Sequence, residues 1–195
     1  MLKHQRQFWD MPNRIVLLIG GYGSGKTYIG ALKSLYMSYL NAPVPGMYVS
    51  PSHQLAVKTI IVTLKELCNR AGIDYTYNQQ RSEFIFHNWG GKLWLGSGDK
   101  PDSLRGPNIG WAVIDEPFIQ KREVFEQMIA RVRHPEAKKS QIFLTGTPES
   151  LNWGWVIAND PDMDIGVVQA STLDNPYLPD DYKQSLLQAY SEEQI

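Results

Sequence analysis

One glycine-rich segment constrains the fold of this chain more than any other feature. The run Gly20–Thr27 reads GGYGSGKT and fits the pattern G-x-x-x-x-G-K-[ST]. It follows an apolar stretch, Ile15–Ile19, that is typical of a buried strand, and apolar residues then recur at helical spacing from Tyr28 to Tyr39. Strand, glycine loop and helix in this order predict a phosphate-binding loop (P-loop) after a strand of a parallel sheet.

The residue types in this loop suit nucleotide binding. Glycines let the backbone curl until successive peptide N–H groups point at phosphate oxygens, and the start of the following helix adds a partial positive charge. Lys26 is predicted to hold the β- and γ-phosphates of ATP, and the hydroxyl of Thr27 to ligate Mg²⁺. The alternative is a glycine-rich turn with a chance lysine, which the flanking strand and helix disfavour. The residues predicted to bind the nucleotide here are Gly21, Tyr22, Gly23, Ser24, Gly25, Lys26 and Thr27.

The composition limits how large a core the chain can form and in which cellular environment it is expected. With 195 residues, 43% of them hydrophobic, the chain can bury one sizeable core, and its net charge of −1 gives no basic field that would indicate nucleic acid. The single cysteine, Cys68, excludes an internal disulfide and follows an apolar helical pattern, so we predict that it is buried. The apolar stretches are too short to span a bilayer, which predicts a soluble intracellular protein with no membrane partner.

The remaining patterns predict an α/β fold with a mostly parallel sheet flanked by helices. Two short strands around Asn88–Gly91 read as a hairpin, which adds antiparallel strands to the sheet. One helix containing Val57 is expected to stop near Gly72, and another to turn Ile129 toward the core. Further strands are predicted at 47–51, 111–114 and 141–145. Turn residues then precede one closing helix, so we predict a core over 1–170 and a small lid over 171–195.

A pair of carboxylates follows the apolar strand at 111–114. This is the Walker B arrangement, in which Asp115 is predicted to order Mg²⁺ and Glu116 to orient and deprotonate the attacking water. Alone, the pair is equally well explained as the acidic start of a loop. Together with the P-loop it indicates ATP hydrolysis by the additional-strand class of P-loop ATPases.

Another strand end is predicted to lie between the P-loop strand and the Walker B strand. Here Thr145 or Thr147, on either side of Gly146, is predicted to sense the γ-phosphate. The alternative is a simple strand-to-loop turn, since these are ordinary turn residues.

In this order the motifs resemble the ATPase part of the large terminase subunit of tailed bacteriophages. The resemblance covers nearly the full length and includes Gln5–Phe8, Leu104–Gly106 and Asp174–Leu178. In that family the first glutamine of the Gln-x-x-Phe stretch contacts adenine, which maps to Gln5. A glutamine amide can both donate to and accept from the adenine edge. The alternative is an exposed polar residue near the terminus.

The resemblance also implies an arginine finger at Arg105, offered to the γ-phosphate of a neighbouring subunit in a ring. A guanidinium that stays charged suits the charge of a phosphoryl transition state. The alternative is a loop arginine in a structural salt bridge. Many relatives carry an arginine inside the P-loop where this chain has Tyr22, which makes Arg105 more important.

The implied function is ATP hydrolysis that drives double-stranded DNA into a preformed capsid, in the cytoplasm of the infected bacterial host. The implied partners are further copies of the chain in a ring, a portal protein and, as a further candidate, a small terminase subunit.

Complete terminases carry a nuclease domain after the lid, and we expect this chain to be a fragment without it. A helicase-type ATPase is an alternative, but it would usually need a second motor lobe. A regulatory nucleotide-binding module is another, which the intact Asp115–Glu116 pair disfavours.

Overall fold

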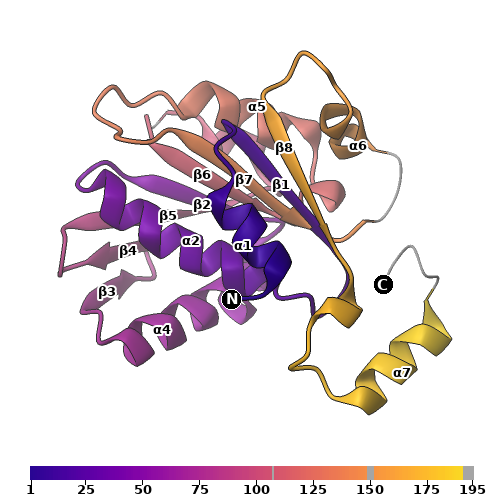
Figure 1. The fold of residues 1–195 in the computed structure, drawn as a ribbon. Helices are drawn as coiled ribbons and strands as arrows, with labels where there is room; N and C mark the ends of the chain where they lie inside the picture. The colour runs from indigo at the N-terminus through magenta and orange to yellow at the C-terminus, as the bar shows by residue number, and fades with distance from the viewer. Residues whose placement is uncertain (107, 149–151, 191–195) are drawn as a thin grey trace.

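One mixed sheet forms the centre of the molecule (Figure 1). The computed structural model describes residues 1–106, 108–148 and 152–190. Within them the strands lie in the order β3-β4-β5-β2-β6-β7-β1-β8. Their bounds are β1 Ile15–Gly20, β2 Gly46–Ser50, β3 Tyr75–Asn78, β4 Glu83–Phe86, β5 Gly91–Ser97, β6 Trp111–Asp115, β7 Gln141–Gly146 and β8 Ile165–Ala170.

Most neighbouring strands of the sheet run parallel. From β5 through β2, β6, β7 and β1 to β8 every pairing is parallel, whereas β3, β4 and β5 pair antiparallel. The α/β fold class and the predicted hairpin between β4 and β5 are therefore confirmed, and β7 lies between β1 and β6 as expected. The third antiparallel strand, β3, and the edge strand β8 were not predicted.

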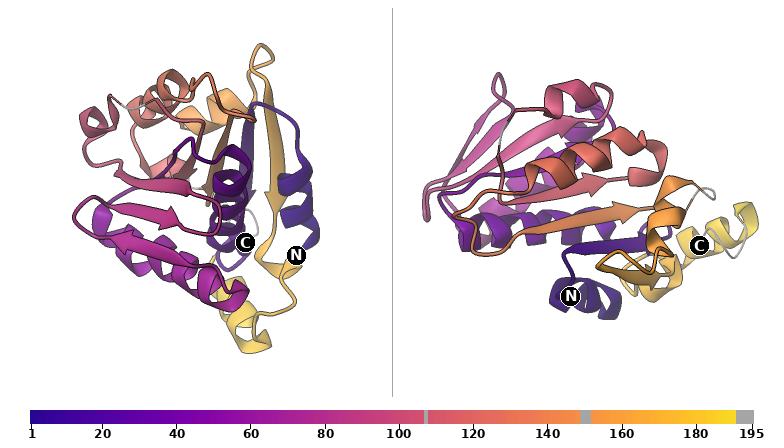
Figure 2. Two further views of the ribbon diagram at one scale, coloured as in Figure 1. Left: turned by 90° about the vertical axis from the view of Figure 1, so that its left-hand side faces the viewer. Right: turned by 90° about the horizontal axis from the view of Figure 1, so that it is seen from above.

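Helices cover both faces of the sheet, and each face has its own apolar core (Figure 2). Alternate residues of β1 show this division, because Val16 and Leu18 belong to one core and Ile15 and Leu17 to the other. The first core is covered by α1 (Lys3–Asp10), α2 (Lys26–Asn41), α3 (His53–Lys58) and α4 (Ile60–Ala71). The second is covered by η1 (Pro101–Leu104), η2 (Pro117–Ile119), α5 (Arg122–Arg131) and α6 (Trp153–Ala158).

Several helix predictions were wrong in detail. The helix after the P-loop exists as α2, but Tyr28 and Tyr39 of the predicted apolar stripe are exposed, and its buried residues include Lys33. The single helix predicted around Val57 is two helices, broken at Thr59, and the Val57 side chain is exposed. The Ile129 side chain is also exposed. In each case an aliphatic or aromatic residue type predicted a buried side chain. In the folded chain that side chain is exposed, and neighbouring residues of the helix fill the core instead.

The chain ends in a segment that extends away from the sheet (Figure 1). It contains η3 (Thr172–Asp174) and α7 (Asp180–Ala189), and it begins directly after β8 ends at Ala170. The predicted closing helix is therefore present, and Leu186 is its buried residue. Cys68 on α4 is buried as predicted, and this burial raises the pKa of its thiol to about 11.

Candidate nucleotide-binding and active site

The P-loop connects β1 to α2 and adopts backbone conformations that suit glycine. Gly23 has φ of 74° and Gly25 has φ of 85°, both in the left-handed region that disfavours other residues. Gly25 also caps α2, and a Cβ atom there would lie 2.5 Å from the Gln5 side-chain nitrogen. Gly25 therefore permits both the turn into the helix and the close approach of α1.

Lys26 is buried at the start of α2 and turns back over the loop. Its Nζ donates to the carbonyl oxygens of Gly20 at 2.8 Å and Gly21 at 3.0 Å. Burial lowers the pKa of this ammonium, while the nearby carboxylates of Glu116 and Asp115 act in the opposite direction. The charge thus lies inside the curve of the loop, where a phosphate oxygen would replace a carbonyl as its partner.

Asp115 ends β6 and is 3% exposed. Its Oδ1 accepts a hydrogen bond of 3.0 Å from the Thr145 hydroxyl, and its backbone oxygen accepts one of 2.6 Å from Gln120. Burial, followed by the charge of Glu116, raises the pKa of Asp115 to about 6, although the bond from Thr145 and the charge of Lys26 oppose this. Burial therefore makes this carboxylate costly to ionise.

Glu116 follows in a conformation that is uncommon for a residue with a side chain. Its φ is 47° and its ψ is 57°, a left-handed geometry that persists only where the surroundings impose it. The backbone N–H of Glu116 donates to Thr145 at 2.7 Å. Its carboxylate accepts two bonds from Thr147, at 2.8 Å from the backbone N–H and 3.2 Å from the hydroxyl. Both threonines of the predicted sensor thus contact the Walker B carboxylates directly.

Gly146 lies between these threonines because no larger residue fits there. A Cβ atom at this position would lie 2.8 Å from Pro117 and 2.8 Å from Phe118, both on η2. The end of β7 is therefore packed tightly against the segment that follows Glu116. Direct sensing of a γ-phosphate by Thr145, Gly146 or Thr147 stays a prediction.

Helix α1 brings Gln5 to the P-loop. The Gln5 amide donates to the carbonyl of Gly25 at 3.2 Å and accepts from the Leu2 backbone N–H at 2.9 Å. His4 on the same helix has its Nε2 2.9 Å from the carbonyl of Ser24, so this nitrogen carries the proton. Gln5 is buried, not an exposed residue near the terminus.

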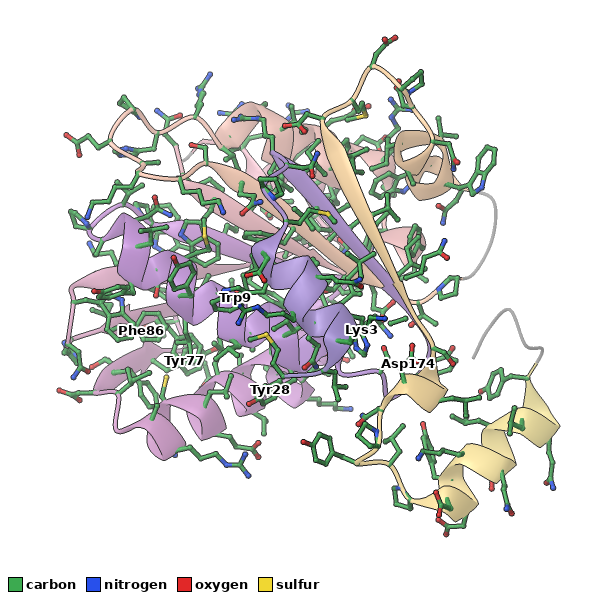
Figure 3. All side chains as sticks on the ribbon, viewed as in Figure 1. Lys3, Trp9, Tyr28, Tyr77, Phe86 and Asp174 are labelled. Carbon is green, nitrogen blue, oxygen red and sulfur yellow. The ribbon has the colours of Figure 1, made fainter. Side chains whose placement is uncertain are left out.

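A pocket of about 400 Å³ opens beside Gln5 and Gly25. Its other walls come from α2, α4 and the C-terminal segment, and include Tyr28, Arg70 and Tyr177. Figure 3 labels Tyr28 and Asp174. Tyr28 on α2 lines the pocket, and Asp174 at the end of η3 directly precedes the lining residue Asn175. The pocket is large enough for a nucleobase next to the phosphate loop.

The C-terminal segment is joined to the P-loop by side-chain-to-backbone bonds. The Thr172 hydroxyl donates to the carbonyl of Tyr22 at 2.6 Å, and the Asn175 amide to that of Gly23 at 2.7 Å. A Cβ atom on Gly23 would lie 3.0 Å from Leu178, so this part of the segment packs directly on the loop. The predicted lid therefore contacts the nucleotide-binding loop itself.

Arg105 lies on the segment that connects β5 to β6. It follows η1, is exposed, and pairs with Asp102 at 3.1 Å. With Lys121 and Glu123 it lines a pocket that contains no P-loop residue. The fold of a single chain thus unites the P-loop, Gln5, Asp115 and Glu116, but it does not bring Arg105 to them.

Comparison with known proteins places the chain in a family. Residues 12–195 match the family model described as phage terminase large subunit. The chain belongs to this family. The terminase resemblance seen in its motifs is thereby confirmed.

Individual relatives agree with this assignment. The PBSX phage terminase large subunit of Bacillus subtilis is 29% identical over 139 residues, which cover 70% of this chain and 32% of that protein. The large terminase of a thermophilic bacteriophage, solved with ADP, is similar with a TM-score of 0.83 at 15% identity over 97% of this chain and 50% of that one. The Thermus phage P74-26 large terminase ATPase domain gives 0.70 at 16% identity, over 98% and 92%. The chain spans half or less of the first two terminases.

Sequence reasoning missed several residues of this terminase site. His4, Gln120 and Thr172 act through hydrogen bonds to backbone groups, for which their residue types gave no specific signal. Tyr48 on β2 is fully buried, and burial followed by the charge of Asp115 raises its pKa well above the ordinary value. Asn175 belongs to the Asp174–Leu178 segment that contributes to the family resemblance, but its contact with the P-loop was not predicted.

The donor atoms of this terminase site fit Mg²⁺. Thr27 and Asp115 offer oxygen ligands, and Mg²⁺ is usually held by one or two carboxylates, substrate phosphates and water. Among the described residues no group of three or more His, Cys, Asp and Glu side chains could hold a metal ion. No helix in the same residues is long and apolar enough to cross a membrane.

Proposed function

We propose that this chain hydrolyses ATP and that hydrolysis powers the packaging of double-stranded viral DNA into a capsid. One observation carries the proposal. The ends of β1, β6 and β7 bring Lys26, Asp115 and Glu116 to one place, with Thr145 and Thr147 bonded to the two carboxylates. This arrangement supplies a phosphate-binding cation, a metal ligand and a base.

Each residue of the proposed site has a separate role in the reaction. Peptide N–H groups of the loop and the Lys26 ammonium bind the β- and γ-phosphates, and Thr27 and Asp115 hold Mg²⁺. Mg²⁺, when bound, neutralises charge on the phosphate oxygens. Glu116 takes a proton from water, whose oxygen bonds to the γ-phosphorus as the bond to the ADP oxygen breaks. The products are ADP and phosphate. The two bonds from Thr147 orient the Glu116 carboxylate for this step.

The proposed motor contains several copies of the chain. We infer a ring in which Arg105 acts on the nucleotide of a neighbouring subunit, because Arg105 is exposed and the pocket that it lines contains no residue of its own P-loop. Double-stranded DNA and a portal protein are the proposed partners, with a small terminase subunit as a further one. Residues 171–195 are proposed as the lid that covers the nucleotide, and the bonds from Thr172 and Asn175 to the P-loop support this role.

A matched pair of variants tests the proposal. Lys26→Ala should abolish ATP binding, because the remaining backbone groups supply no full charge. Glu116→Gln should bind ATP normally in calorimetry yet release phosphate about 10² to 10⁴ times more slowly, because the base is lost and the shape is kept. Glu66→Gln, at an exposed position on α4, serves as the control. Unchanged affinity in Lys26→Ala, or unchanged turnover in Glu116→Gln, would refute the corresponding assignment.

A further inference from the structure

The pocket beside the P-loop has an aromatic wall that the hydrolysis chemistry does not use. Tyr177 and Tyr28 both line it, together with the buried Gln5. Tyr177 is 82% exposed, the highest value for a large apolar side chain in the described residues. An exposed aromatic ring at a pocket beside a phosphate loop is a suitable surface for the flat face of a nucleobase.

The backbone of Tyr177 is fixed relative to the P-loop although its ring is exposed. Asn175 accepts a hydrogen bond of 3.0 Å from the Tyr177 backbone N–H and donates one of 2.7 Å to the carbonyl of Gly23. One amide side chain therefore links the tyrosine to the loop that would hold the phosphates. The distance from the phosphate site to the tyrosine backbone is thereby set by the fold.

We propose that Tyr177 contributes to nucleotide affinity by stacking on the base, beside the adenine contact that the family resemblance already implies for Gln5. The inference rests on the proposed function, because it requires a nucleotide in this site. Stacking depends on the π-face that every base offers, whereas hydrogen bonds depend on the donor and acceptor pattern at the base edge. Tyr177 should therefore strengthen the binding of ATP and GTP alike.

Three ligands and three variants test the contribution of Tyr177. Binding of ATP, GTP and inorganic tripolyphosphate is measured by calorimetry for the wild type, Tyr177→Ala and Tyr177→Phe. Tyr177→Ala should weaken ATP and GTP by the same factor, about 5- to 100-fold, and leave tripolyphosphate unchanged. Tyr177→Phe keeps the ring and should bind like the wild type. Tyr39→Ala, which removes another exposed tyrosine at the far end of α2, should change none of the three affinities.

Each contrary result has a defined meaning. Wild-type ATP affinity in Tyr177→Ala would overturn the inference alone, and so would a parallel loss of tripolyphosphate binding, because the segment would then support the phosphate loop instead of the base. A Tyr177→Phe variant as weak as Tyr177→Ala would replace stacking by a hydrogen bond from the hydroxyl. A wild-type protein that binds neither ATP nor tripolyphosphate would instead refute the proposed function. Because Tyr177 is exposed, the variants should keep the thermal stability of the wild type.

Discussion

At the scale of single residues, the buried carboxylate of Asp115 lowers the stability of the fold at a position where the proposed function needs a metal ligand. The carboxylate is 3% exposed, and its pKa is raised from an ordinary value of 3.8 to about 6. Between these two pH values the folded chain binds a proton that the unfolded chain has released. The free energy of unfolding therefore falls as pH rises through this range, and it stays lower above pH 6 in the absence of metal.

Replacement of Asp115 by asparagine should remove this cost. We expect Asp115→Asn to melt a few degrees above the wild type at pH 7.5 in the presence of a metal chelator, and to lose this advantage near pH 4, where the wild-type carboxyl is protonated. ATP turnover should be lost in the same variant, because the proposed metal ligand is gone. Scanning calorimetry at the two pH values measures the effect. A variant that melts below the wild type at pH 7.5 would show that the charge stabilises the fold.

At the scale of elements, Lys33 joins three parts of the fold. It lies on α2, its ammonium donates to the carbonyls of Phe8 at 2.8 Å and Trp9 at 3.2 Å on α1, and it lies 4.2 Å from the ring centroid of Phe143 on β7. Burial, with a smaller effect from Lys139, lowers its pKa from 10.5 to about 7. The Lys33 amine thus links α1, the helix that carries Gln5, to α2 and β7, although burial makes its positive charge costly.

This lysine predicts a specific pH dependence of stability. Between pH 7 and pH 9 the unfolded chain keeps the Lys33 proton and the folded chain has lost it, so the free energy of unfolding should rise with pH by up to about 1.4 kcal/mol per unit. In Lys33→Met this rise should be absent. Urea unfolding at pH 6, 7, 8 and 9 compares the two proteins. If both show the same slope, another group is responsible for it.

Sequence patterns predicted the elements whose own residues show a recognisable pattern. The apolar runs of β1, β6 and β7 gave the parallel centre of the sheet, and glycine patterns gave the P-loop and the hairpin. Helix α1 was missed because it is short and mostly polar, and Lys33 because a lysine on a helix is ordinarily solvated. The bonds from Thr147 to Glu116 cross 31 sequence positions and exist only because β6 and β7 are neighbours in the sheet.

At the scale of the whole molecule, the role proposed for Arg105 would require a second subunit. Its side chain is 63% exposed and its pairing with Asp102, 85% exposed, is a surface ion pair of the kind that contributes about 0–1 kcal/mol, so it is free to exchange partners. If Arg105 acts across a subunit boundary as proposed, a monomer lacks the cation for the γ-phosphate.

Specific ATPase activity should therefore rise with protein concentration or on ring assembly. Arg105→Ala should bind ATP normally and turn over about 10³ to 10⁵ times more slowly in the ring. Mixed rings of Arg105→Ala and Glu116→Ala should regain part of the activity, because some interfaces pair an intact Glu116 with an intact Arg105. Arg81→Ala, at another exposed arginine, is the control. If rings shown to be mixed stay inactive, Arg105 has a structural role or acts within its own subunit.

The pocket beside the P-loop also has a practical consequence, because Met1 and Tyr177 line the same space. The N-terminal residue of the chain therefore lies where the nucleotide is proposed to bind. A purification tag or fluorescent protein fused directly to Met1 would stand at the mouth of that pocket and compete with the ligand being assayed. Recombinant protein for kinetic work is therefore best prepared with a cleavable tag. For the same reason, an environment-sensitive dye attached at Met1 would report nucleotide occupancy without any label on the catalytic residues.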